Sequence, residues 1–198
     1  MGNRIRDWRI IDQHYQKLLR HSFLELASPH HTRAAVEAIS EIVAPITEIE
    51  SAVELGCGTA PCLDELKKMS KKTLGVTMLQ EPINHEVLRR DMHFSGLEDA
   101  SYDLVIMRHA LEHSPMPLMM LMEVHRISKK YALIIVPVPN RRMIFTWADH
   151  YSVFEKETWE KLFEAANFKI YTFKKVAYLE IAPGEWDQEY RFLLVKRS

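Results

Sequence analysis

The chain has 198 residues, of which 47% are hydrophobic and 27% charged, values typical of one globular domain that exclude a disordered or fibrous chain. Its 26 basic and 27 acidic residues leave a formal net charge of −1, so no broad positive field favours a nucleic-acid partner. Two cysteines are too few for a disulfide framework, no secretory segment is evident, and no apolar run reaches the roughly 20 residues that cross a bilayer. We therefore expect a cytoplasmic protein without a membrane partner.

The first fifty residues predict two helices. Apolar residues three or four positions apart between residues 5 and 27 are typical of an amphipathic helix. Ser28 and Pro29 are then an N-cap and first-turn signal for a second helix. We assign residues 1–48 as a helical cover of a single domain that spans residues 1–198.

The pattern changes after residue 50. Four short runs are almost entirely apolar, at residues 52–55, 73–78, 102–107 and 131–136. Strands that are buried on both faces have this composition, which indicates a parallel sheet covered by helices. Helix-compatible stretches follow at 60–69 and 114–128, and a weaker strand ends near Asp91. The alternation of strands and helices predicts an α/β doubly wound domain.

The C-terminal part, residues 138–198, has a different pattern. After a loop, residues 155–166 predict a helix, and Asn167 suits the left-handed position that ends it. Two strand-like segments, 168–179 and 186–196, are separated by a Pro-Gly turn, so we expect them to be antiparallel.

The most specific motif is a glycine-containing turn between a strand and a helix, with the sequence Val53-Glu54-Leu55-Gly56-Cys57-Gly58-Thr59. Its two glycines lack Cβ atoms where a ligand approaches the backbone, and the following helix directs its first N–H groups toward that ligand. Glu54 ends an apolar strand and needs a polar partner at that edge. The motif is neither a dinucleotide fingerprint nor a P-loop, and on its own it leaves an ordinary tight turn as the alternative.

Together with other segments, this motif resembles the class I S-adenosylmethionine-dependent methyltransferases over residues 50–180. Asp91-Met92-His93 resembles the acidic end of their third strand, and Tyr102-Asp103-Leu104-Val105 the start of their fourth. The segment from Arg108 to Pro115 resembles the next loop in small methyltransferases of the ubiquinone-biosynthesis type and in phage-borne relatives. The resemblance implies a three-layer Rossmann-like fold with a seven-stranded, mostly parallel sheet of order 3-2-1-4-5-7-6 and an antiparallel strand 7.

The resemblance also implies an S-adenosylmethionine site in residues 49–137, with residues 138–198 on the substrate side. The residues expected to bind the cofactor are Glu54, Gly56, Cys57, Gly58, Thr77, Met78, Asp91, Met92, His93 and Arg108. Asp91 would accept a hydrogen bond from the adenine amino group. Thr77 stands where relatives carry a carboxylate for both ribose hydroxyls, and one hydroxyl cannot match that acceptor. We expect a side chain at Gly56 to block the cofactor path while leaving most of the core intact.

Histidines are the candidates for acceptor chemistry, because imidazole is the natural base near neutral pH. The two catalytic candidates are His150, after the fifth strand, and His109, which the resemblance implies to lie beside the transferring methyl. For His150 the alternative is that it anchors its loop. The spacing of His109, Glu112 and His113 resembles a metal motif without further support, and the family resemblance explains the segment better, so we expect no metal.

The sequence therefore predicts an S-adenosylmethionine-dependent methyltransferase whose acceptor is a small molecule or a sugar, through a hydroxyl or an amine. Nucleic acid is not expected as the acceptor, since no Asn/Asp-Pro-Pro-Tyr/Phe motif is present. One alternative is a fold relative that binds S-adenosylmethionine or S-adenosylhomocysteine without transferring methyl. Another is a protein-interaction module that binds no cofactor.

Overall fold

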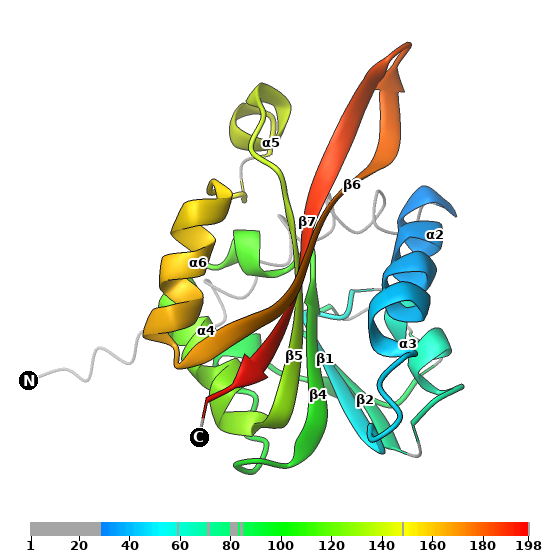
Figure 1. Ribbon diagram of the computed structural model, residues 1–198, viewed down its shortest axis with the longest axis vertical. Helices are drawn as coiled ribbons and strands as arrows, with labels where there is room; N and C mark the ends of the chain where they lie inside the picture. The colour runs from blue at the N-terminus through cyan, green and yellow to red at the C-terminus, as the bar shows by residue number, and fades with distance from the viewer. Residues whose placement is uncertain are drawn as a thin grey trace, which may run out of the picture.

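The computed structural model describes residues 29–197 except Thr59, Lys71, Gln80–Pro82, Asn84 and Ala148. A seven-stranded sheet lies between two layers of helices (Figure 1). The strand order is β3-β2-β1-β4-β5-β7-β6, and β7 is antiparallel to both neighbours while the other pairs are parallel. The predicted three-layer Rossmann-like fold and its strand order are confirmed. The helix predicted at 5–27 and its successor's cap at Ser28 lie outside the described residues.

The strands are β1 (Ser51–Leu55), β2 (Lys72–Thr77), β3 (Val87–Arg89), β4 (Tyr102–Arg108), β5 (Ser128–Pro137), β6 (Phe168–Ala182) and β7 (Glu185–Lys196). The α-helices are α2 (Pro29–Ala38), α3 (Pro61–Leu66), α4 (Pro117–Ile127), α5 (Arg141–Phe145) and α6 (Lys156–Ala165). A π-helical turn, η1 (Ile39–Val43), extends α2, and two 3₁₀ turns are η2 (Met92–Phe94) and η3 (Leu111–His113).

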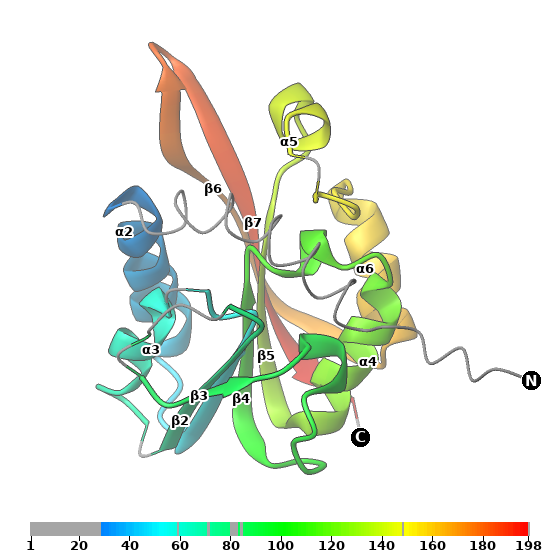
Figure 2. The same ribbon diagram turned by 180° about the vertical axis from the view of Figure 1, so that it is seen from behind.

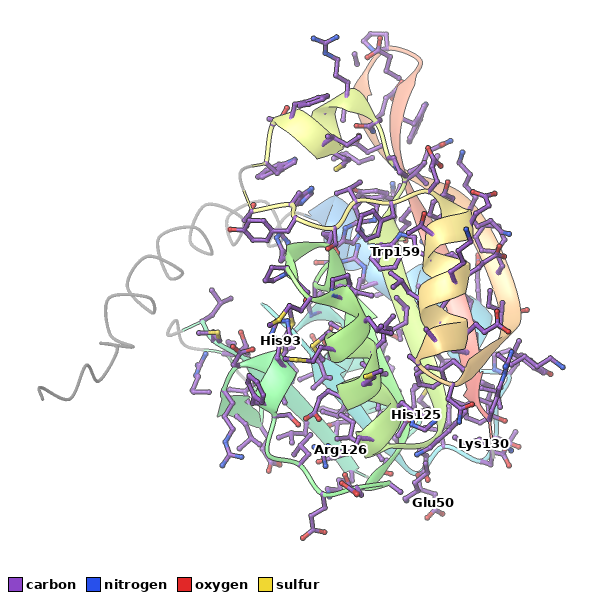
Figure 3. All side chains as sticks on the ribbon, turned by 90° about the vertical axis from the view of Figure 1, so that its left-hand side faces the viewer. Glu50, His93, His125, Arg126, Lys130 and Trp159 are labelled. Atoms are coloured by element: carbon purple, nitrogen blue, oxygen red, sulfur yellow. The ribbon has the colours of Figure 1, made fainter. Side chains whose placement is uncertain are left out.

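The central strands β1, β4 and β5 are largely buried on both faces because helices lie on each side of the sheet (Figures 1 and 2). Helices α4 and α6 pack on one face, where Trp159 of α6 is fully buried (Figure 3). Helices α2 and α3 pack on the other face, together with η1. This explains why the apolar runs of the sequence form β1, β2, β4 and β5, since neither face of these strands is turned to solvent over most of its length.

Three local signals of the sequence have clear outcomes. Asn167 adopts φ 62° directly after Ala166, the C-cap of α6, as its position predicted. Gly184, at φ 79°, turns the chain between β6 and β7. The helix predicted from residue 114 begins later, at Pro117, because the Ser114 hydroxyl accepts a hydrogen bond from the Met116 amide at 3.1 Å and forms a separate turn first.

The parallel strands β1, β2, β4 and β5 all end at the same edge of the sheet. In open α/β sheets this carboxyl edge carries the ligand site. Every expected cofactor residue lies in the last two residues of β1, β2 or β4 or in the loops that follow β1, β2 and β3.

Candidate active site

The glycine turn after β1 joins three strands. Gly56 and Gly58 have φ values of 71° and 50°, a region that residues with a Cβ atom rarely adopt. The amides of Gly56 and Cys57 both donate to the Val76 carbonyl of β2, at 2.8 and 3.0 Å. A Cβ atom on Gly56 would lie 2.5 Å from Cβ of Ala110, after β4. Glycine is therefore required here by the close approach of two loops.

The side chains beside this turn are packed rather than reactive. Cys57 is buried, and burial raises the pKa of its thiol well above the ordinary value, which keeps sulfur protonated and poorly nucleophilic. Thr77 ends β2, and its Oγ1 accepts a hydrogen bond from the Leu79 amide at 3.1 Å. Among the described residues the threonine hydroxyl has no acceptor, so its hydrogen can donate to an oxygen of a ligand. Met78 follows it half-buried.

Asp91 leads into a short hydrogen-bonded chain. Its Oδ1 accepts from the backbone amide of His93 at 2.9 Å and lies 2.7 Å from the ring Nδ1 of the same residue. His93 Nε2 lies 2.7 Å from Oγ of Ser114, which links the loops after β3 and β4 (Figure 3 labels His93). Burial alone would raise the pKa of Asp91, but its hydrogen bonds with His93 outweigh burial and lower that pKa. Asp91 is thus an ionised cap of η2 as well as a candidate adenine partner, and Met92 packs in the core behind it.

Buried charges cross the sheet at the carboxyl edge, on the face covered by α2. We call Glu54, Arg108, Glu189 and Arg191 the charge row; each is at most 4% exposed. Glu189 accepts from Nε of Arg191 at 2.6 Å and lies 3.8 Å from Nη2 of Arg108. Burial alone would raise the pKa of Glu189, but the neighbouring His109, Arg108 and Arg191 lower it to about 2. The row is held together by charge pairing where water is excluded.

Glu54 is the exception within the charge row. Its Oε2 is buried and has no hydrogen-bond partner among the described residues. Burial raises the pKa of Glu54 to about 7, although a hydrogen bond with Cys62 and the charge of Arg108 oppose the shift. Such an orphaned oxygen is costly in the ligand-free protein, and it is suited to a positively charged ligand group.

We expect the Glu54→Gln variant to show the cost of this carboxylate. A group whose folded-state pKa is raised from 4.5 stabilises the fold below that pH, and the stabilisation is lost as pH rises toward 7. The stability of the neutral variant relative to the parent should therefore increase by about 3 kcal/mol between pH 4 and pH 8. Urea unfolding across this range measures it, and a constant difference would show that Glu54 is ionised at no cost.

His109 follows β4 with φ 46°, a left-handed backbone for a residue with a side chain. Its Nε2 lies 2.8 Å from Oε2 of Glu189, and its Nδ1 lies 3.2 Å from Oε1 of Glu112. Although burial opposes it, the two carboxylates raise the pKa of His109. A ring that donates from both nitrogens has no lone pair for another proton. The geometry suits His109 to a fixed cation better than to the base that the sequence suggested.

The loop after α5 is attached directly to η3. The carbonyl of Glu112 accepts from the amides of Tyr151 and Ser152, both at 2.9 Å. The Ser152 hydroxyl donates to the Ser114 carbonyl at 2.7 Å. Residues distant in the sequence are thereby fixed beside the end of β4.

His150 lies in this attached loop and faces η3. Its Nδ1 donates to the Met143 carbonyl at 2.8 Å. The ring stacks on Trp147, with centroids 5.8 Å apart, and meets the edge of His113 at 4.9 Å. Burial lowers the pKa of His150, so the neutral ring keeps an acceptor at Nε2. The structure thus brings His150 and His109 to the same end of the sheet through their contacts with η3.

Sequence reasoning missed the acidic partners of these histidines. In the sequence, Glu112 stands out only through its spacing from two histidines, and neither Glu189 nor its ion-pair partner Arg191 belongs to a recognisable motif. Charges at alternate positions of an antiparallel strand usually mark a solvated face. Here α2 covers that face, and Nη2 of Arg191 donates to the Ala34 carbonyl at 3.4 Å. The local signal in β7 was present, but its burial depends on a helix far away in the sequence.

A glycine turn at the carboxyl edge of a 3-2-1-4-5-7-6 sheet, with β7 antiparallel, defines the class of S-adenosylmethionine-dependent methyltransferases. A family model described as "Methyltransferase domain" matches residues 11–172, and the chain belongs to this family. The predicted family, enzyme class and cofactor are confirmed. A search of curated proteins finds no match.

Solved structures have the same fold at low sequence identity. The chain superposes with a TM-score of 0.71 on the 1,6-didemethyltoxoflavin-N1-methyltransferase of Burkholderia thailandensis, at 15% identity, covering 94% of this chain and 91% of that one. A SAM-dependent methyltransferase from Archaeoglobus fulgidus gives 0.66 at 16% identity, covering 83% and 94%. The [4+2]-cyclase SpnF gives 0.67 at 14% identity, covering 83% and 80%. Among the described residues, no helix has the length and apolar character of a membrane span.

Proposed function

We propose that this chain transfers the methyl group of S-adenosylmethionine to a hydroxyl or amine of a small molecule or sugar. The observation that carries the proposal is the attachment of the loop after α5 to η3. This attachment brings the side chains of Glu112, His113 and His150 together at the carboxyl edge of the sheet, where the cofactor is expected. Two fold relatives support a small acceptor by their names. One is the toxoflavin-precursor methyltransferase described above, and the other is a magnesium protoporphyrin IX methyltransferase from Synechocystis PCC 6803 with bound S-adenosylhomocysteine.

Two features of the structure fit the cofactor. The turn at Gly56 and Gly58 leaves no Cβ atoms where the methionine and sugar would pass. The orphaned Oε2 of Glu54 matches a cationic group, and the cofactor carries an ammonium and a sulfonium. In this proposal Thr77 donates to a ribose oxygen, and Asp91 accepts from the adenine amino group next to Met92 and His93. Arg108 lies at the methionine end, and Met78 and Cys57 line the edge.

When bound, the cofactor supplies an activated methyl on its sulfonium. The chain must align the acceptor in line with that methyl and exclude water. We assign the proton released by the acceptor to the cluster around His150, whose Nε2 has no hydrogen-bond partner among the described residues while Nδ1 is engaged by the Met143 carbonyl. His109, held between Glu112 and Glu189, positions η3 as a fixed cation. It is a positioning residue in this scheme.

We expect His150→Ala to leave the affinity for S-adenosylhomocysteine nearly unchanged and to lower turnover about 10²-fold or more, the scale of a lost proton-transfer group. Calorimetry and a radiolabelled-methyl assay on an acceptor found in a metabolite screen measure the two effects. The matched control is His125→Ala, since His125 of α4 packs on Phe168 away from this edge. Full turnover in His150→Ala would exclude the residue from acceptor chemistry.

A second candidate function is binding of the cofactor without methyl transfer. It is favoured by one fold relative, which is named for a [4+2] cyclisation rather than a methyl transfer. The two candidates differ in one measurement. A chain that binds S-adenosylhomocysteine but methylates no member of a broad acceptor panel would support the second, and any enzyme-dependent methylated product excludes it.

A further inference from the structure

Three side chains with metal-ligating atoms converge beside the carboxyl edge. One donor atom each from Glu112, His113 and His150 lies within 4.8 Å of the other two. Glu112 and His113 come from η3, and His150 comes from the loop after α5. The sequence offered only His109 as a third ligand near η3. In the structure Nε2 of His109 contacts Glu189, and the third side chain beside Glu112 and His113 is that of His150.

Both imidazoles are oriented as metal-binding histidines are. Nδ1 of His113 lies 3.1 Å from the Asp149 carbonyl and 3.2 Å from its Oδ2. Nδ1 of His150 donates to the Met143 carbonyl at 2.8 Å. Oxygen acceptors on one ring nitrogen fix the tautomer and leave Nε2 as the ligand atom. Within the described part of the chain, Nε2 of each ring has no hydrogen-bond partner, so it is the nitrogen open to coordination.

The carboxylate supplies an independent indication of a missing cation. Glu112 is fully buried, and its Oε1 is engaged by His109 at 3.2 Å. Its Oε2 is buried without a hydrogen-bond partner among the described residues. A buried anionic oxygen without a partner is strongly disfavoured, and a metal ion in the cluster would satisfy it.

The dimensions of the cluster permit coordination with small adjustments. Ligand atoms about 2.1 Å from a tetrahedral metal are roughly 3.4 Å apart. The three ligand atoms here lie within 4.8 Å of one another, so shifts of about 1 Å at the side-chain ends would bring them to that separation. The backbone stays in place, because the Glu112 carbonyl holds the amides of Tyr151 and Ser152. Only the side-chain ends need to move.

We propose that Glu112, His113 and His150 form a site for a divalent first-row transition metal, with Zn²⁺ and Co²⁺ as suitable probes. Two imidazoles and one carboxylate favour these ions over Mg²⁺ or Ca²⁺, which prefer oxygen ligands. Three protein ligands leave a coordination position open. This role rests on the proposed function: an oxygen of the acceptor would occupy the open position, and the metal ion would polarise it for methyl transfer. With a metal bound, Nε2 of His150 is a ligand and no longer takes the acceptor's proton; the ion would instead lower the pKa of the bound hydroxyl, which loses its proton to solvent before methyl transfer.

The test is metal binding by the full chain after treatment with a chelator. Titration with Co²⁺ should give a visible absorption band that saturates at one ion per chain, and Zn²⁺ should displace it. Glu112→Gln, which keeps the side-chain volume, and His150→Ala should each weaken Co²⁺ binding more than tenfold. His125→Ala should bind as the parent does.

Absence of a saturable band in the parent, or equal affinity in the folded Glu112→Gln and His150→Ala variants, would overturn the metal site. Circular dichroism confirms that each variant is folded. S-adenosylhomocysteine binding is measured on the same metal-free sample. Failure of the metal site therefore leaves the proposed methyl transfer standing, and failure of cofactor binding leaves the metal site to be judged on its own.

Discussion

Replacing Glu189 with glutamine is expected to lower the free energy of unfolding by about 3–5 kcal/mol, the usual cost of removing one partner from a buried ion network. Glu189 is fully buried and is the shared acceptor for Arg191 and His109. The variant keeps the volume of the side chain but leaves two cationic groups without their counter-charge. Urea unfolding at pH 7 measures the change.

The acid dependence of the same pair of proteins provides a second check. A carboxylate whose folded-state pKa is lowered from 4.5 to about 2 stabilises the fold above pH 4.5 and loses that effect as pH falls toward 2. The parent should therefore lose about 3 kcal/mol through this group, and Glu189→Gln should lack that loss. The matched control is Glu185→Gln, at the exposed start of β7, which should follow the parent. Identical acid profiles of all three would contradict the charge row.

The Gly56→Val variant is expected to bind S-adenosylhomocysteine at least tenfold more weakly and to melt at a lower temperature. The sequence suggested that the added side chain would enter the cofactor path and spare the core. The structure corrects the second half of that expectation, because the new Cβ atom would meet Ala110 at 2.5 Å from a backbone at φ 71°. The loops after β1 and β4 must then separate, and both contribute to the proposed site.

A control separates backbone strain from the steric clash. Gly184 has a similar φ of 79°, but no atom lies within 4 Å of where its Cβ would be. Gly184→Val should therefore show only the left-handed penalty of about 1–2 kcal/mol and keep its ligand affinity. If calorimetry and thermal melts show equal losses in the two variants, the contact between the two loops is not important.

The fold was predictable because its signals are local. The apolar runs that became β1, β2, β4 and β5 are uniform enough to indicate strands buried on both faces. Asn167 marked the end of a helix by its tolerance of positive φ. The order of the strands came from the resemblance to a family, since spacing alone does not determine which strands are neighbours.

The acceptor side was less predictable because its contacts are nonlocal. His150 reaches Glu112 only because a loop is pinned to η3 by backbone hydrogen bonds, and these leave no trace in side-chain patterns. Glu189 and Arg191 look like a solvated face of β7 until α2 covers them. Ser114 begins the stretch that the sequence predicts as a helix, although its hydroxyl instead forms a turn with Met116 and contacts His93. In each case tertiary packing decided the role of a polar side chain.

The most direct test of the account is calorimetric titration of S-adenosylhomocysteine into the purified full chain. The account places the ligand on the turn at Gly56 and Gly58, with its ammonium near the orphaned oxygen of Glu54. It predicts saturable binding of one molecule per chain, with the released heat depending on the buffer at pH 7, because the ammonium favours ionised Glu54 and expels its proton. A titration without saturable heat would contradict the assignment of this edge as the cofactor site.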